Sequence, residues 1–502
     1  MKKHNKRLLF LGSVYSFGNA AQNILTIILL PLYTSYLYPK DFGIVALMNL
    51  TVVLIAKLFS PINQAFNRYY FKPDYQDKSG ALLFNLFSLL VLKTIIVTAV
   101  FWFAGQRICN VLFGNQEILY IVRLYTVVLL LMPASLFLRQ FIRLKEMAKY
   151  YVFISLISLI ISSVVIIYSL VVLKTGVAAL VYGKICGLLF IVIMTVPIIL
   201  KNSFFKVSLK VIKEPLKYGY PQIVAGYSNR LIQSGDRYVL RMLDTIETVG
   251  LYSFGYRIAG LVQMLLVDPL RRALRPIVLK KEGDPEEQKK FLMHAATYYY
   301  FAGFLMALGI SLFARELIML LARKEEFWAS WKIVPIIVFS YIQHGFGQFI
   351  RWGLVMKNKS FHISGILIVA AVVNIGLNFL FIPLWGILGA AFATMISYII
   401  WNLLSMYYSN KFYGLKFQNL RIIHITVIGV LIYMAAVLLP EDKLIISVLI
   451  KFVMFLSFPV LMYITGFFSK SERDELKGYY RKMKVVGILP FINEKIRAIR
   501  GV

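Results

Sequence analysis

Several basic residues lie inside long apolar stretches of this sequence, where a charged side chain is energetically unfavourable. They are Lys57, Lys93, Arg123, Lys184, Arg230, Arg237, Arg257, Lys332 and Lys451. The only acidic residues that we place in such stretches are Asp236 and Asp268. A basic residue at the centre of a membrane-spanning helix costs about 2.5–3.5 kcal/mol. The central cations therefore predict a water-filled cavity, which would suit an anion with several oxygens, such as a phosphate or diphosphate.

The spacing of polar residues predicts which helix faces line this cavity. Lys57, Pro61, Gln64 and Arg68 follow one another in steps of four, three and four residues, which places them on one helix face. Lys57 and Arg68 would bind substrate there, or would anchor the end of the helix that faces the cytoplasm.

A second polar face belongs to the predicted helix 217–241. Gln233 and Asp236 share one stripe of this helix, and Arg230 and Arg237 lie on the adjacent stripe. Asp236 would either pair locally with Arg237 or bind a coupling ion. Arg230 would either bind substrate or pair with an acid.

The candidate substrate-binding residues are Lys57, Arg68, Lys93, Lys184, Arg230, Gln233, Arg237, Arg257, Asn19 and Asn23, with Asp236 as a candidate for ion coupling. Lys93 and Lys184 could face either the cavity or a helix interface. Asn19 and Asn23 lie on a polar stripe of the predicted helix 9–37, and such amides also join helices to one another through hydrogen bonds.

The composition requires a membrane environment for the elements that position these residues. The chain has 502 residues, of which 59% are hydrophobic and 16% are charged, with a mean hydropathy of +0.73. Soluble domains are roughly 45–50% apolar and about 25% charged. We expect an all-α polytopic membrane protein with fourteen spans. The spans are 9–37, 42–67, 81–104, 117–138, 150–173, 177–200, 217–241, 248–270, 292–321, 332–356, 361–383, 386–408, 421–439 and 444–468.

The distribution of charge predicts the orientation of these spans. The formal net charge is +32, but the basic residues mostly separate apolar blocks, so membrane topology explains them better than nucleic-acid binding does. With both termini in the cytoplasm, the cytoplasmic segments hold 38 basic residues and the opposite side holds 8. The basic tail 470–502 would lie on anionic lipid of the inner leaflet.

An internal repeat predicts two lobes. Asp41-Phe42-Gly43 and Thr248-Val249-Gly250 open two spans at an offset of 207 residues, and Pro61 has a counterpart in Pro269. Copies of six spans each would share one orientation, as in a parallel repeat. The predicted domains are the N-terminal lobe 1–200, the linker 201–216, the C-terminal lobe 217–410, two further spans in 411–469 and the tail 470–502.

The sequence lacks the usual motifs of enzymes. It has no Walker A, HExxH or GxSxG pattern, and Cys109 and Cys186 suit neither a disulfide framework nor a metal site. We expect no catalytic residue, no cofactor and no metal. The connection 315–331 is interpreted as an ordinary solvated loop, which leaves little room for a polymerase or glycosyltransferase site outside the membrane.

Three groups of residues resemble a known family. They are Pro31-Leu32-Tyr33 with Tyr38-Pro39-Lys40-Asp41-Phe42-Gly43; Tyr218-Gly219-Tyr220-Pro221 with Ser234-Gly235-Asp236-Arg237-Tyr238; and Asn374, Asn378, Ile382-Pro383 with Gly386-Ile387-Leu388-Gly389. The pattern covers roughly residues 8–410. It is similar to bacterial polysaccharide-biosynthesis flippases of the O-antigen and capsule type, within the multidrug, oligosaccharidyl-lipid and polysaccharide exporter superfamily.

The resemblance implies a MATE-like fold of two six-helix lobes plus two C-terminal helices. It implies a multi-pass protein of the bacterial cytoplasmic membrane that moves undecaprenyl-diphosphate-linked oligosaccharide between leaflets by alternating access. By position, Asp236 and Arg237 are carried over from the matching motif. Implied partners are the lipid-linked substrate, membrane lipid and polysaccharide polymerase or assembly proteins, with no nucleic acid. The alternatives are an ion-coupled multidrug extruder and a lipid II flippase of the same superfamily.

Overall fold

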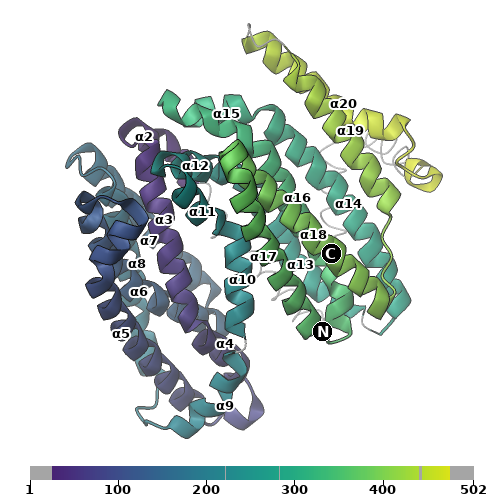
Figure 1. Ribbon diagram of the computed structural model, residues 1–502. Coiled ribbons are helices and arrows are strands. Elements are labelled where there is room, and N and C mark those ends of the chain that lie inside the picture. Colours follow the sequence, from purple (N-terminus) through teal and green to yellow (C-terminus); the bar gives the residue numbers. More distant parts are fainter. Residues whose placement is uncertain (1–24, 221, 282, 440–443, 475–502) are drawn as a thin grey trace. The chain divides into compact units, whose positions relative to one another are not determined.

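The computed structural model describes residues 25–220, 222–281, 283–439 and 444–474, which form helices joined by short connections (Figure 1). The chain divides into two compact units. One holds the described residues of Met1–Met293 and Phe313–Lys416, and the other those of His294–Leu312 and Phe417–Val502. The predicted boundary between two lobes at 201–216 stays a prediction.

Twelve described helical segments are long and apolar enough to cross a membrane, and each coincides with a predicted span. Ten are the single helices α5 (Ser79–Phe113), α6 (Leu119–Leu144), α7 (Ala148–Val171), α8 (Ala178–Lys201), α14 (Pro285–Leu312), α16 (Val334–Met356), α17 (Ser360–Trp385), α18 (Ile387–Tyr413), α19 (Asn419–Val437) and α20 (Leu444–Ile464). The other two are composite helices.

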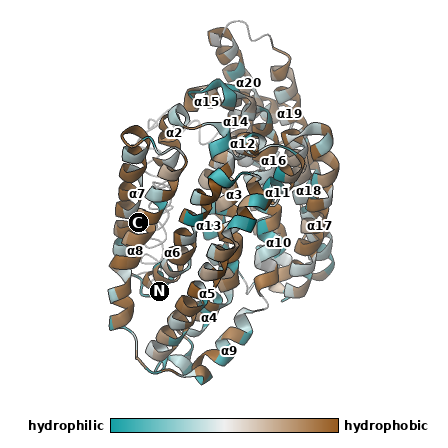
Figure 2. Cartoon of the chain, turned by 60° about the vertical axis from the view of Figure 1, so that its left-hand side comes forward, coloured by the Kyte–Doolittle hydropathy of each residue, from teal (hydrophilic) through white to brown (hydrophobic). Residues whose placement is uncertain are grey.

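Figure 2 shows hydrophobic colouring along most of α7, α8 and α17, as expected for helices that face lipid.

Two of the predicted spans take another form. Most of 9–37 lies outside the described residues, and the structure describes the short helix α2 (Leu30–Tyr36) from it. The span 217–241 is divided among α9 (Leu209–Gly219), α10 (Gln222–Ser234) and α11 (Asp236–Leu243). These helices carry many polar residues, so hydropathy describes them poorly.

Two predictions about 292–331 are wrong. The helix expected to run to residue 321 ends at Leu312, and a separate helix α15 (Ala314–Leu321) follows, because the backbone of Phe313 leaves the helical conformation (φ −102°, ψ 15°). The connection 315–331 is not a plain solvated loop, since it continues into the 3-10 helix η5 (Glu325–Ile333) with Phe327 fully buried. Apolar residues surround Phe313, so hydropathy alone could not locate the break there.

The two composite helices correspond to repeat-related spans, and each has a break within its length. The first consists of α3 (Pro39–Ala56), a 3-10 turn at Lys57–Phe59 and α4 (Ser60–Tyr69). The second consists of α12 (Ile246–Val262), a π-helical turn at Gln263–Val267 and α13 (Asp268–Lys280). Each break falls just before a repeat-related proline, Pro61 or Pro269, because proline lacks an N–H and its ring clashes with the preceding turn.

α3 and α12 pack closely near the ends where they begin, which we call the paired end. A Cβ added at Gly250 would lie 1.8 Å from the carbonyl oxygen of Pro39, and one added at Gly43 would lie 2.2 Å from that of Ile246. The repeat-related glycines therefore permit this contact. The rings of Phe42 and Phe327 pack beside it, with centroids 5.1 Å apart.

Beyond their breaks the composite helices pack on different neighbours. α4 packs on α9, where a Cβ at Gly219 would lie 2.3 Å from the carbonyl oxygen of Pro61. α13 packs instead on α16. The two composite helices are thus joined at the paired end, and their other halves belong to separate helix clusters.

Candidate functional site

A first cavity lies between α3, α7 and α12 and has a volume of about 210 Å³. Its polar wall groups include Asn49, Ser162, Ser163 and Ser253, and its cationic group is Arg257. Arg257 is exposed, and it lies one helical turn after Ser253 on α12, so both side chains face the same side. No acidic residue lines this cavity in the part of the chain described, so the cavity favours an anion.

Two further predicted cations flank the first cavity. Lys184 of α8 donates a hydrogen bond to Oδ1 of Asn49, and its Nζ lies 5.7 Å from the centroid of the Tyr125 ring. Arg237 of α11 donates through Nε to Oγ of Ser253 at 3.3 Å. Asn49 and Ser253 are both wall residues, so each of these cations reaches the cavity through one polar neighbour.

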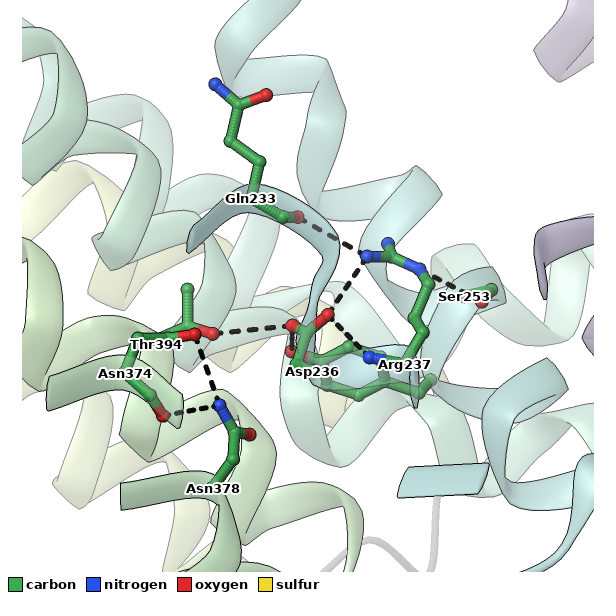
Figure 3. Close-up of polar contacts among 8 residues, drawn as sticks. Gln233, Asp236, Arg237, Ser253, Asn374, Asn378 and Thr394 are labelled. Atoms are coloured by element: carbon green, nitrogen blue, oxygen red, sulfur yellow. Dashed lines mark hydrogen bonds and ion pairs between the residues drawn. The ribbon is translucent and has the colours of Figure 1, made fainter. Parts of the chain in front are cut away.

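Asp236 is fully buried and bonded on both carboxylate oxygens (Figure 3). Oδ1 accepts from the backbone N–H of Arg237 at 2.9 Å and from its Nη1 at 3.2 Å. Oδ2 accepts from the Tyr252 hydroxyl at 2.6 Å and, more weakly, from Thr394 at 3.4 Å. Arg237 also donates to the carbonyl oxygen of Gln233, at 3.3 Å. The ion pair therefore holds the start of α11 in place.

Arg230 and Lys57 form a second cationic group around α10. The guanidinium of Arg230 lies close enough to Arg237 and Lys57 for their charges to repel, and its Nε is buried without a hydrogen-bond partner. Lys57 sits at the break between α3 and α4, with its Cδ 3.8 Å from the Cβ position of Gly226. Asp236 offsets part of this repulsion, and the remaining excess of positive charge favours an anionic ligand.

A second cavity, of about 310 Å³, follows the first along α12. Arg257 lines both cavities, and the second continues past the π-helical turn to Asp268. Asp268 forms an ion pair with Arg271 at 3.2 Å. The two cavities thus follow one composite helix.

The structure places two predicted residues near α9. Arg68 stacks over the ring of Tyr218 at 4.2 Å, and nearby Glu214 accepts hydrogen bonds from the hydroxyls of Tyr69 and Tyr75. These bonds lower the pKa of Glu214, whereas burial and the same carboxylate raise the pKa of Tyr75 to about 12. Arg68 therefore supports the contact between α4 and α9.

Two other candidates, Lys93 and Gln233, bond to residues outside these groups. Lys93 of α5 donates to the hydroxyl of Tyr220 at 2.9 Å, just before α10. Gln233 donates to Asn229 at 3.5 Å, within α10. Asn19 and Asn23 lie outside the described residues.

Sequence reasoning missed a buried polar group beside Asp236. Asn374, Asn378 and Thr394 are fully buried, and Asn378 donates to the backbone and side-chain oxygens of Asn374 at 2.7 and 3.2 Å (Figure 3). Both asparagines belong to the third group of family-like residues. A search for charged residues within apolar stretches could not find them, because they carry no charge.

The fold matches solved membrane transport proteins. One is a lipid II flippase, MurJ, in an inward closed conformation, with a TM-score of 0.71, 15% identity, and coverage of 90% of this chain and 99% of that chain. Another is a multidrug resistance MATE family transporter of the MOP superfamily in an inward-facing conformation, with a TM-score of 0.66, 14% identity, and coverage of 82% and 98%. This chain is therefore a multi-pass membrane protein with the MATE-like fold.

The family follows from the sequence match. The model of the polysaccharide biosynthesis protein family matches residues 12–281, more than half of the chain, so the protein belongs to that family. A probable low-salt glycan biosynthesis flippase, Agl15 of Haloferax volcanii, is 24% identical over 290 residues. That match covers 57% of this chain and 60% of the relative, so it spans less than two thirds of the relative's length.

Proposed function

We propose that this protein is a flippase that carries a lipid-linked oligosaccharide from one leaflet of the membrane to the other for polysaccharide biosynthesis. The observation that carries the proposal is the position of Arg257 in a cavity with no acidic wall among the described residues, flanked by Lys184 and Arg237. Such a site suits the diphosphate that joins a polyprenyl lipid to its glycan.

The wall chemistry agrees with a glycan rather than an organic cation. Hydroxyl and amide groups of Asn49, Ser162, Ser163 and Ser253 offer donors and acceptors to sugar hydroxyls. A multidrug site for cations would need an accessible, unpaired acid, whereas Asp236 is buried and paired with Arg237. Asp268 in the second cavity is paired with Arg271. These features favour the flippase over the drug extruder.

The size of the cavity agrees with alternating access. A volume of about 210 Å³ lies below the roughly 300–1,000 Å³ of sites for drug-sized ligands, so this conformation has room for a diphosphate and not for several sugar rings. Transport would then require separation of the paired end, where α3 and α12 meet. The charge asymmetry of the sequence predicts that this end faces the outer side of the membrane.

Finer parts of the hypothesis rest on the family resemblance. Undecaprenyl diphosphate as the lipid, the bacterial cytoplasmic membrane as the location, cytoplasmic termini and a polymerase partner all stay predictions. Ion coupling at Asp236 also stays a prediction. Since Oδ1 is bonded to Arg237, a coupling cation would have to displace the Tyr252 hydroxyl from Oδ2, and dependence of transport on sodium would test this.

The experiment is a deletion of the gene in its own host, followed by extraction of lipid-linked glycans. We expect complete lipid-linked units to accumulate on the cytoplasmic face. The wild-type gene should clear them, and Arg230→Ala/Arg257→Ala should not. Altered drug sensitivity without an accumulated intermediate would contradict the flippase. If the double variant clears the lipid-linked glycans normally, the proposed function stands, but the assignment of Arg230 and Arg257 to the binding site is wrong.

A further inference from the structure

A third cavity, which we call the arginine pocket, lies between α13 and α16 and has a volume of about 450 Å³. Arg271 and Arg275 enter it from α13, and Arg351 enters it from α16. The remaining walls are Gln348, Trp352 and apolar side chains of Leu274, Leu279, Val355 and Ile363. None of these residues was among the candidates from the sequence.

Arg351 lines this pocket and also carries an unmet hydrogen-bonding group. The residue is only 9% exposed, and its guanidinium carbon lies 4.2 Å from the centroid of the Trp401 ring. Its Nη1 is buried and has no hydrogen-bond partner among the described residues. Buried polar atoms are nearly always bonded, so the incompletely bonded guanidinium of Arg351 favours an anion close by.

The other two arginines could bind the same anion. Arg275 is exposed, and no described acid pairs with it. Arg271 is paired with Asp268, which itself lines the second cavity. An anion in the arginine pocket therefore competes with Asp268 for Arg271.

The arginine pocket continues the row of cavities along one composite helix. The first and second cavities share Arg257, and the ion pair between Asp268 and Arg271 joins the second cavity to the arginine pocket. The π-helical segment Gln263–Val267 lies along this row of cavities, and π-helical turns often occur at functional sites. Cationic groups thus recur from Arg275 to Arg257.

We propose that the arginine pocket is a second phosphate-binding site, which receives the diphosphate of a prenyl-linked substrate before it reaches Arg257. This inference rests on the proposed function. The arginines supply bidentate donors to the phosphates, and the apolar wall of Leu279, Val355 and Ile363 suits the first isoprene units. The headgroup of an anionic phospholipid has the same chemistry, so the experiment must separate the two sources.

The test measures binding of farnesyl diphosphate to the full-length protein in phosphatidylcholine nanodiscs by titration calorimetry. We expect two sites in the wild type. Arg275→Gln should weaken one site about tenfold, the effect of losing one charge-assisted hydrogen bond, and Arg275→Gln/Arg351→Gln should abolish it. Arg257→Gln should remove the other site. Lys280→Gln, on the same helix but outside the pocket, should bind like the wild type.

The outcomes separate the two hypotheses. If the wild type binds one equivalent that disappears in Arg257→Gln, the proposed function stands and the arginine pocket is wrong. If the wild type binds none, the proposed function fails as well. Unchanged binding in Arg275→Gln, which alters only an exposed side chain and should fold, would also overturn the pocket.

A second arm identifies the source of the phosphate. We expect farnesyl diphosphate to retain both sites in nanodiscs of phosphatidylglycerol. Loss of the Arg275-dependent site in those nanodiscs alone would mean that bilayer phospholipid occupies the pocket, which would overturn its assignment to the substrate.

Discussion

The glycine contact between α3 and α12 allows the conformational equilibrium to be shifted by one methyl group. In Gly250→Ala the added Cβ would lie 1.8 Å from the carbonyl oxygen of Pro39 and 3.0 Å from the backbone nitrogen of Gly43. Both neighbours are backbone atoms, so no side chain can rotate away. The methyl group can be accommodated only if the two helices separate.

The size of the effect follows from that distance. The contact with Pro39 must lengthen from 1.8 Å to at least 3.0 Å, a shift of about 1.2 Å at the paired end. Overpacking of this kind costs about 1–3 kcal/mol. The cost applies only while the ends are paired, so the ratio of separated to paired molecules should rise about 5- to 150-fold.

The assay follows access to the first cavity. Ala46→Cys, on the cavity wall, is introduced into a variant in which Cys109 and Cys186 are replaced by serine. A membrane-impermeant thiol reagent is then added to the outer side of spheroplasts. Gly250→Ala should speed labelling at position 46. The matched control is Gly376→Ala, where an added Cβ meets no atom within 4 Å, and its labelling rate should stay unchanged.

Two results would refute this reasoning. Equal labelling in Gly250→Ala and Gly376→Ala, with both proteins folded and transporting normally, would mean that the paired end does not control access. Slower labelling in Gly250→Ala would mean that the wrong end had been assigned to the outer side.

Three further predictions concern charged groups. Asp236→Ala should lower stability by about 3–5 kcal/mol, because it leaves Arg237 buried without its ion pair; thermal unfolding in detergent measures this. Arg257→Gln should slow clearance of lipid-linked glycan about 10- to 150-fold, since a charge-assisted hydrogen bond is worth about 1.5–3 kcal/mol; accumulated intermediate in cells measures this. Burial would raise the pKa of Glu472, but hydrogen bonds from Tyr298, Ser469 and Arg421 outweigh it and lower the pKa to about 2. The stability that comes from this depressed pKa is present above the unfolded value of about 4.3 and is lost as pH falls toward 2. The melting temperature of the wild type should therefore fall more steeply between these pH values than the melting temperature of Glu472→Gln.

Each of these predictions has its own control. Asp236→Asn/Arg237→Gln should melt above Asp236→Ala, because no unpaired charge remains, and a lower value would contradict the ion-pair argument. The guanidinium of Arg123 lies over the Trp102 ring, and Arg123→Gln should clear glycan normally. A defect equal to that of Arg257→Gln would mean that removing any cation slows clearance, whatever its position. Parallel pH curves for the wild type and Glu472→Gln would contradict the assignment of acid sensitivity to Glu472.

Local pattern was enough to predict the membrane class and most of the helices. Hydropathy is a sum over neighbouring residues, so twelve spans could be found without any knowledge of their contacts. Hydropathy failed to predict the division of α9–α11, which contain many polar residues. It also failed at Phe313, where a helix ends within an apolar run. The repeat paired Pro61 with Pro269, but the sequence analysis did not predict the helix breaks that the structure shows just before each proline.

The sequence by itself determined that unbalanced cations lie within the apolar helices, because residue type and helical spacing suffice to count and orient them. Only the tertiary structure decided their neighbours. It placed Arg257 in a cavity, bonded Arg237 to Asp236, directed Lys93 to Tyr220 and left Arg351 with an unmet donor. Spacing gives the face of a helix on which a side chain lies, but the helix that packs on that face comes from a distant part of the chain.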